Sequence, residues 1–379
     1  MTEPSQDDIT HIVSSIFDVE ETIITNETLR FKIDSYDFKD KFVRLAQNLE
    51  LLGMITRLEK SHDGLYIDIS RIDKPKKKWL SKSWVPRILF VVTVTMVLID
   101  GYFRTEGVNS LAFIGDPFEM SILYAFSLIG ILGVHESGHL IAAKKHKIKT
   151  TWPYFIPGVP VFGIPTFGAL IQSRGLTINR DILFDIAIAG PIAGLIIAII
   201  VSMFGAYTSP EIDNMMAEEL FENGILVKCD DFEFSLKWWR ENMDIRCGQP
   251  ILITASFAIF DKGEDGMQVL QSPIMFAAWL GFLITFLNLL PAWQLDGGHL
   301  ARSLLGKKWH KIATYASTGL LAALGYWFMA LFILFLSSRS RDMKPLDDIS
   351  PLSKNRKKLF VVVAILGFLC APLPSGILP

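Results

Sequence analysis

Residues 118–146 read FEMSILYAFSLIGILGVHESGHLIAAKKH, an apolar run that contains the motif HExxH. The run is long enough to cross a bilayer as one helix, because a transmembrane helix needs about 20 apolar residues. His135 and His139 are four residues apart and share one face of such a helix. Two imidazoles on one face can bind one Zn²⁺, and Glu136 beside them can act as general base. Since ionisable side chains are costly in lipid, this stretch predicts a functional metal site within a membrane.

The composition of the whole chain also indicates a membrane protein. Half of its 379 residues are hydrophobic, a fifth are charged, and the formal net charge is −2. With several further apolar runs, this composition predicts an α-helical multi-spanning membrane protein of about six or seven membrane segments. A net charge near zero gives no reason to expect nucleic acid as a partner, so the lipid bilayer is the expected surrounding. A homo-oligomer is compatible with this composition.

Three regions of the chain differ in their patterning. Residues 1–75 predict a small soluble α+β domain. Residues 84–338 hold the long apolar runs and predict an intramembrane core, and residues 339–379 predict a basic loop with a last transmembrane span. Lysines precede residue 84 and follow Ala143. Because basic loops favour the cytoplasmic side, we expect a multi-pass protein of the cell membrane with a cytoplasmic N-terminus.

The N-terminal domain has a readable order of elements. Its periodicity predicts helices over residues 5–19 and 37–52, a strand over 29–33, and a hairpin of strands 54–58 and 65–69. A structural cap on the cytoplasmic side is one interpretation of this domain, and a regulatory or substrate-presenting module is the other.

Two segments of the core do not resemble ordinary transmembrane helices. Residues 151–176 are apolar but rich in proline and glycine, which predicts a re-entrant hairpin that lines the active site. Such a hairpin can offer a strand edge to an extended peptide, whereas a loop at the membrane interface is the alternative. Residues 207–272 carry an acidic excess and predict an extracytoplasmic insert, where Cys229 and Cys247 can pair if that compartment is oxidising.

Glycines mark two of the later apolar runs. The third span, about residues 182–206, contains Gly190 and Gly194, and small residues at this spacing permit close packing between helices. Residues 310–336 are too long for one ordinary span and contain Gly325. A single crossing would leave the basic loop after residue 338 outside, so we expect two short or re-entrant helices here.

The span over residues 273–299 ends in a second polar motif, NLLPAWQLDGGH. Asp296 is its candidate metal ligand, because a carboxylate beside two imidazoles is a common set for catalytic zinc. Pro291 breaks the helix and leaves Asp296 on turned backbone that can reach the HExxH span.

Alternatives to this ligand set stay open at the sequence level. His299 is a rival third ligand and Glu119 a weaker one. Asp296 can also cap a helix that begins near Gly298, which does not exclude a role as ligand. The metal is inferred from ligand type alone, and Co²⁺ or Fe²⁺ would accept the same set.

The two motifs together resemble the site-2 protease family of intramembrane zinc metalloproteases, whose pattern is HExxH with a distal Asn-x-x-Pro-x-x-x-Leu-Asp-Gly. The resemblance covers about residues 118–305 and is similar to the branch found in archaea, cyanobacteria and plastids. The insert shows no carboxylate-binding loop of the PDZ domain that many bacterial members carry. The Gly-Pro-x-x-Asn sequence of some members is replaced here by Gly190-Pro191-Ile192-Ala193-Gly194.

The resemblance implies a mechanism and a substrate class. It implies that His135, His139 and Asp296 bind one Zn²⁺ per chain, that Glu136 is the general base, and that Asn288 contacts the substrate backbone or the oxyanion. The expected reaction is hydrolysis of a peptide bond in or near the transmembrane segment of a membrane-anchored protein substrate. A catalytically silent scaffold or chaperone of the same fold is the alternative. A transporter would need polar residues along several spans, and they cluster at two places only.

Overall fold

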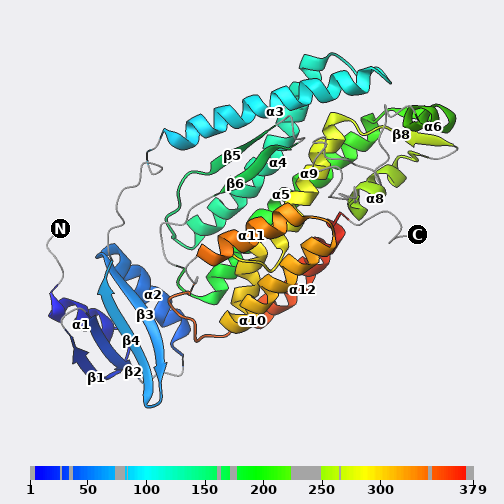
Figure 1. Ribbon diagram of the computed structural model, residues 1–379. Coiled ribbons are helices and arrows are strands. Elements are labelled where there is room, and N and C mark those ends of the chain that lie inside the picture. The colour runs from blue at the N-terminus through cyan, green and yellow to red at the C-terminus, as the bar shows by residue number, and fades with distance from the viewer. Residues whose placement is uncertain are drawn as a thin grey trace.

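The computed structural model describes residues 5–25, 28–33, 37–72, 82, 84–159, 164–170, 177–222, 249–263, 266–339 and 344–372. A small unit with a β-sheet lies at one end of a bundle of long helices (Figure 1). We call the first part, residues 5–72, the N-terminal unit. The lysines before residue 84, which predict a cytoplasmic N-terminus, lie between residues 73 and 83, and of these residues the structure describes only residue 82.

The N-terminal unit is a four-stranded antiparallel sheet covered by two helices. The strand order is β1-β2-β4-β3, and Ser61 pairs with Gly64 at the turn between the last two strands. The predicted hairpin, the strand near residue 29 and both helices are present, while the strand β1 was missed because VEETII does not alternate in polarity. The elements are α1 (Gln6–Ser14), β1 (Val19–Ile24), β2 (Thr28–Ile33), α2 (Lys39–Leu51), β3 (Met54–Ser61) and β4 (Gly64–Arg71).

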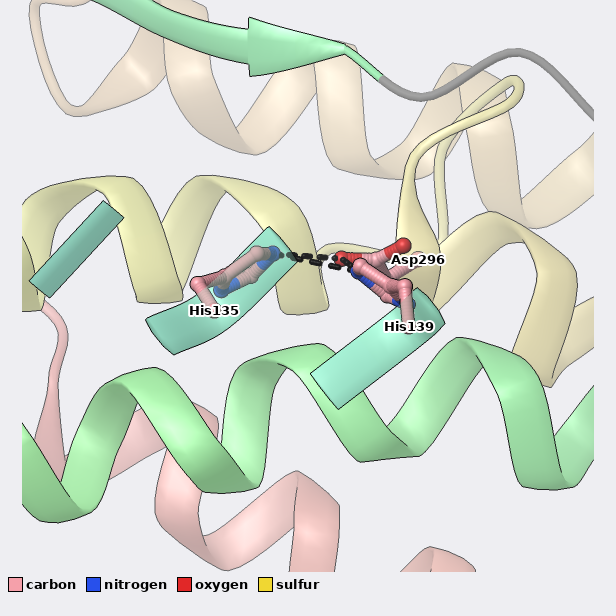
Figure 2. A group of neighbouring side chains, drawn as sticks. All are labelled: His135, His139 and Asp296. Carbon is pink, nitrogen blue, oxygen red and sulfur yellow. Dashed lines mark hydrogen bonds and ion pairs between the residues drawn. The ribbon is translucent and has the colours of Figure 1, made fainter. Parts of the chain in front are cut away.

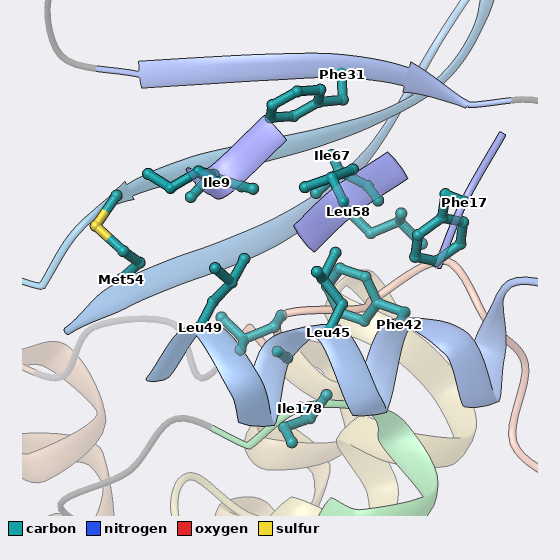
Figure 3. Packing of buried hydrophobic residues seen from close by; sticks show 14 of the residues in the cluster. Ile9, Phe17, Phe31, Phe42, Leu45, Leu49, Met54, Leu58, Ile67 and Ile178 are labelled. Atoms are coloured by element: carbon teal, nitrogen blue, oxygen red, sulfur yellow. The ribbon is translucent and has the colours of Figure 1, made fainter. Parts of the chain in front are cut away.

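The core of the N-terminal unit extends into the helix bundle. Phe31, Phe42 and Ile67 are fully buried between the sheet and its helices (Figure 3). Ala143 and Ile178, which belong to the bundle, are part of the same buried cluster. The unit therefore packs on the bundle through a shared apolar core rather than through a linker alone.

Three of the described helices are long and apolar enough to cross a membrane. They are α3 (Val85–Asn109), α4 (Pro117–Lys145) and α5 (Arg180–Thr208). The helix α9 (Pro273–Leu289) is apolar but shorter. These helices support a membrane protein, while the expected count of about six or seven segments stays a prediction.

The proline- and glycine-rich stretch after α4 forms a β-hairpin in its described part. The strands β5 (Tyr154–Val159) and β6 (Ile164–Leu170) pair antiparallel and lie between α3 and α4 (Figure 1). Phe90 of α3 and Phe155 of β5 are in edge-to-face contact with ring centroids 5.1 Å apart. The hairpin shape agrees with the sequence, and its depth in the membrane stays a prediction.

The insert after α5 is not polar throughout. It contains β7 (Glu211–Asp213), α6 (Asn214–Glu222), α8 (Ile251–Ile259) and β8 (Met267–Val269). The helix α8 is apolar and packs on α5, where the hydroxyls of Ser202 and Ser256 are 2.8 Å apart. Cys229 and Cys247, whose pairing was considered, lie outside the described residues.

The last third of the chain contains α10 (Asp296–Ala323), α11 (Trp327–Arg339) and α12 (Lys354–Leu369). Residues 310–336 do not form one helix, because the chain breaks between α10 and α11, where Gly325 has a φ of 88°. The chain then returns to the N-terminal unit, since Leu58 N donates to Leu346 O at 2.9 Å. The predicted break into two helices is present, while the return of the basic loop to the cytoplasmic side stays a prediction.

Candidate metal centre

Two histidines of α4 and the first residue of α10 meet at one point (Figure 2). His135 Nε2 and His139 Nε2 each lie 3.3 Å from Asp296 Oδ2, and the two imidazole nitrogens lie 3.2 Å from each other. Within the part of the chain that the structure describes, this is the group of His, Cys, Asp and Glu side chains that could hold a metal ion. The fold thus brings Asp296 next to two histidines that precede it by 157 or more positions in the sequence.

The spacing of the three donor atoms fits tetrahedral zinc. Zinc holds imidazole nitrogen and carboxylate oxygen at roughly 2.0–2.2 Å, which places two ligands of a tetrahedron about 3.3 Å apart. The observed separations between His135, His139 and Asp296 are 3.2 and 3.3 Å. Nitrogen and carboxylate donors are also the types that catalytic zinc accepts, with a fourth position left for water or substrate. The residues present therefore fit the metal.

The ring of His139 is oriented by a carbonyl group of the neighbouring helix. Its Nδ1 lies 2.7 Å from Ile186 O of α5. A carbonyl oxygen can only accept, so Nδ1 carries the proton and Nε2 presents its lone pair to the site. This is the tautomer that a metal ligand needs, and a second partner of this kind commonly fixes the ring.

Two glycines of α5 make room for the imidazoles. A Cβ at Gly190 would overlap Nε2 of His139, and one at Gly194 would lie 2.9 Å from Cβ of His135. The sequence predicts that these glycines allow close helix packing, and the structure shows that the groups that approach them are the two candidate metal ligands, His139 and His135. Sequence spacing suggested the close approach but not its partner.

The turn between α9 and α10 carries Asp296 to the histidines. The helix α9 ends at Leu289, Leu290 is its C-cap, and Pro291 follows. A Cβ at Gly297 would overlap Leu289 O, so the first turn of α10 lies directly against the end of α9. Helix α10 begins at Asp296 itself, two residues earlier than the capping alternative assumed.

The remaining candidates occupy different positions. Asn288, on the last turn of α9, places Nδ2 3.4 Å from Nε2 of His135. Glu136 is on α4 and only 6% exposed. Glu119 is in the first turn of the same continuous helix, roughly 24 Å from His135 at 1.5 Å of rise per residue, so it is excluded as a ligand. His299 follows on α10 but is not part of the donor cluster.

These features define a class, a helical membrane protein with a candidate His-His-Asp metal site between its helices. The model of the family described as peptidase family M50 matches residues 123–332, which is more than half of the chain. The chain belongs to peptidase family M50, the site-2 protease family.

Curated relatives are plant proteins. The chain is 28% identical over 253 residues to the protein named "Probable zinc metalloprotease EGY2, chloroplastic" of Arabidopsis thaliana, covering 64% of this chain and 40% of the relative. It is 27% identical over 269 residues to "Probable zinc metalloprotease EGY1, chloroplastic" of the same plant, covering 66% and 44%. The chain thus spans less than half the length of these relatives. No solved structure matches.

Proposed function

We propose that this protein is an intramembrane zinc metalloendopeptidase that cleaves membrane-anchored proteins in or near their transmembrane segment. The observation that carries the proposal is the separation of 3.2 to 3.3 Å between the donor atoms of His135, His139 and Asp296, within a bundle of membrane helices. Membership of peptidase family M50 and the printed names of the relatives support it.

Glu136 is the general base of the proposed reaction. Zinc bound by these residues would supply a Lewis acid that polarises the substrate carbonyl and makes water easier to deprotonate. The Glu136 carboxylate follows the first ligand on α4, accepts the proton of the attacking water, and returns it to the leaving amine. We assign to the side-chain amide of Asn288 the role of donating to the substrate carbonyl oxygen, and its position 3.4 Å from Nε2 of His135 supports this role.

The β5–β6 hairpin is the proposed guide for the substrate. It lies beside α4 in Figure 1, and a strand of this region passes over the ligands in Figure 2. An extended peptide can add to a free strand edge through main-chain hydrogen bonds. A substrate helix must unwind before its amide bond is accessible, so glycine or proline near the cleavage site favours cleavage.

The proposed location is a cell membrane, with the N-terminal unit on the cytoplasmic side. Lys144 and Lys145 in the last turn of α4, and the lysines that precede α3 in the sequence, support the orientation through the positive-inside rule. The relatives are named chloroplastic, and a thylakoid or envelope membrane would be the corresponding location in a plastid.

The test is co-expression with a tagged single-span protein whose transmembrane helix contains a Gly-Pro pair. Wild type should release a shortened product, and Glu136→Gln should release none while it still binds one zinc per chain. Glu119→Gln is the matched control, because it changes the same residue type at the far end of α4. Equal amounts of product from wild type and Glu136→Gln would refute the proposed base.

A further inference from the structure

Helical geometry is interrupted on both sides of the residues that carry Asp296. Before them, the turn contains Trp293 with a φ of 45°, and after them Gly306 has a φ of 77° and a ψ of −176°, which interrupts α10. We call residues 296–305 the ligand-bearing segment. Because helical geometry is lost on both sides, the orientation of this segment is not set by the rest of α10 and needs contacts of its own.

One buried ion pair anchors the ligand-bearing segment. Arg302, six residues after Asp296, is 1% exposed and is the largest fully buried side chain of the described residues. Its Nη1 donates to Asp348 Oδ1 at 3.0 Å, and its Nη2 donates to Asp348 Oδ2 at 2.7 Å. Two parallel charge-assisted hydrogen bonds fix both the distance and the angle between their partners.

The partner carboxylate is itself held from outside α10. Arg180, the first residue of α5, donates from Nε to Asp348 Oδ1 at 3.1 Å and from Nη2 to the Asp348 carbonyl at 2.8 Å. The preceding residue Asp347 donates its N–H to Ile178 O at 2.7 Å. The loop that carries Asp348 is thus tied to the start of α5, the helix that packs on both histidines.

We propose that Arg302 is a positioning residue for the metal centre, which fixes the ligand-bearing segment so that Asp296 meets the two histidines of α4. The proposal rests on the proposed function, because it assumes that Asp296 binds the metal. Arg302 does not touch the metal or the substrate. It acts through the backbone of the segment, and the loop with Asp348 acts as the fixed support.

The geometry explains why this contact matters for binding. Metal ligands must be held within about 0.5 Å of their productive positions, and partners outside the ligand set typically change metal affinity by about 10–100-fold. Without the Arg302 contact, the segment keeps the packing of its first turn against the end of α9 but loses its charged anchor, and it can tilt at Gly306. The His135 and His139 pair stays in place on continuous α4, so only the third ligand moves.

The experiment measures the zinc dissociation constant of the purified full chain in detergent by competition with a zinc indicator. Arg302→Met keeps the apolar stem, removes the charge, and should weaken zinc binding about 10–100-fold. The zinc affinity of Arg302→Lys should lie between those of Arg302→Met and wild type, because an ammonium group cannot form the two parallel hydrogen bonds of a guanidinium. Arg356→Met is the matched control. It removes a similar bidentate pair, with Asp185 at 2.7 and 2.6 Å, from α12 instead of α10.

The absorption spectrum of the Co²⁺-loaded protein is a second readout. A displaced third ligand should change the visible bands of Arg302→Met, whereas the bands of Arg356→Met should stay as in wild type. A general loss of stability would not separate the two variants in this way. Asp348→Asn tests the same contact from the other side if Arg302→Met does not fold. Unchanged zinc affinity in either folded variant overturns the positioning role, whereas a wild type that binds no zinc overturns the proposed function itself.

Discussion

Both histidines of the site lie next to a polar atom that comes from another helix. Ile186 O of α5 accepts a hydrogen bond from Nδ1–H of His139, and Asn288 of α9 lies beside His135. The glycines of α5 leave the space in which the rings stand. The HExxH motif therefore supplies the two candidate histidine ligands, and the neighbouring helices supply their orientation, as expected for partners that lie outside the ligand set.

At the scale of single residues, we expect Gly190→Ala to abolish metal binding. The added Cβ would overlap Nε2 of His139, the atom that faces the site. Alanine is intrinsically better than glycine in a helix by about 1 kcal/mol, so the loss would not come from the helix itself. Zinc per chain, measured by elemental analysis, should fall towards zero. Gly130→Ala is the control, because a Cβ there meets nothing within 4 Å, and zinc lost equally in both variants would contradict the steric explanation.

At the scale of elements, α3 and α4 are joined by a polar contact among apolar residues. Tyr124 of α4 donates to Asp100 Oδ2 of α3 at 2.7 Å, and Arg104 Nε donates to the same oxygen at 2.7 Å. A Cβ at Gly101 would lie 2.5 Å from the Tyr124 ring, so the two backbones approach closely here. Such a contact fixes one end of the helix pair and leaves room for the hairpin between their other ends (Figure 1).

Tyr124→Phe should loosen this helix pair. It leaves the 4% exposed Asp100 with one donor fewer, and a hydrogen bond to a charged group contributes about 1.5–3 kcal/mol. We expect a lower midpoint of thermal unfolding in detergent. Tyr315→Phe, at a side chain that is 55% exposed, should leave the midpoint unchanged. Equal midpoints for wild type and Tyr124→Phe would show that the contact is not stabilising.

On the scale of the whole molecule, one polar junction connects the N-terminal unit with the bundle. Lys39 of α2 donates to Asp181 of α5 at 2.7 Å and to Pro351 O at 3.2 Å. Arg356 of α12 reaches Asp181 at 3.1 Å. Together with the pairing of Leu58 to Leu346, these contacts tie the first and last described parts of the chain to the start of α5. A change in the N-terminal unit can thus reach the segment that holds Asp348.

The stabilisation that Asp348 provides through Arg302 and Arg180 should depend on pH. Burial by itself raises the pKa of Asp348, but the hydrogen bonds and charges of Arg302 and Arg180 outweigh it, and the pKa lies below its ordinary value of 3.8. A lowered folded-state pKa stabilises the fold fully above the unfolded pKa, and this stabilisation is lost as the pH falls through the folded value. The gap in unfolding free energy between wild type and Asp348→Asn should therefore be constant from pH 7 to about 5 and narrow below about 4. A gap that narrows near neutral pH would contradict this assignment.

Local patterns predicted most of the elements and all three members of the donor cluster. The apolar runs and the histidine spacing gave α4 with His135 and His139, and the proline break gave the position of Asp296. The strand β1 was missed because VEETII has no alternation, and the pairing of its neighbour β2 decides its structure. The ion pair of Arg302 was also missed, because a single arginine in a polar stretch gives no signal until Asp348 lies next to it.

The sequence by itself determined what depends on spacing along one helix: the span of α4, the shared face of its two histidines, and the break before Asp296. Only the tertiary structure decided what depends on contacts between distant segments. It brought Asp296 to 3.3 Å from both imidazoles, packed Gly190 on His139, and paired Asp348 with Arg302. The physical reason is that helical periodicity is a local property of the chain, whereas the packing of helices and the pairing of buried charges depend on side chains far apart in sequence.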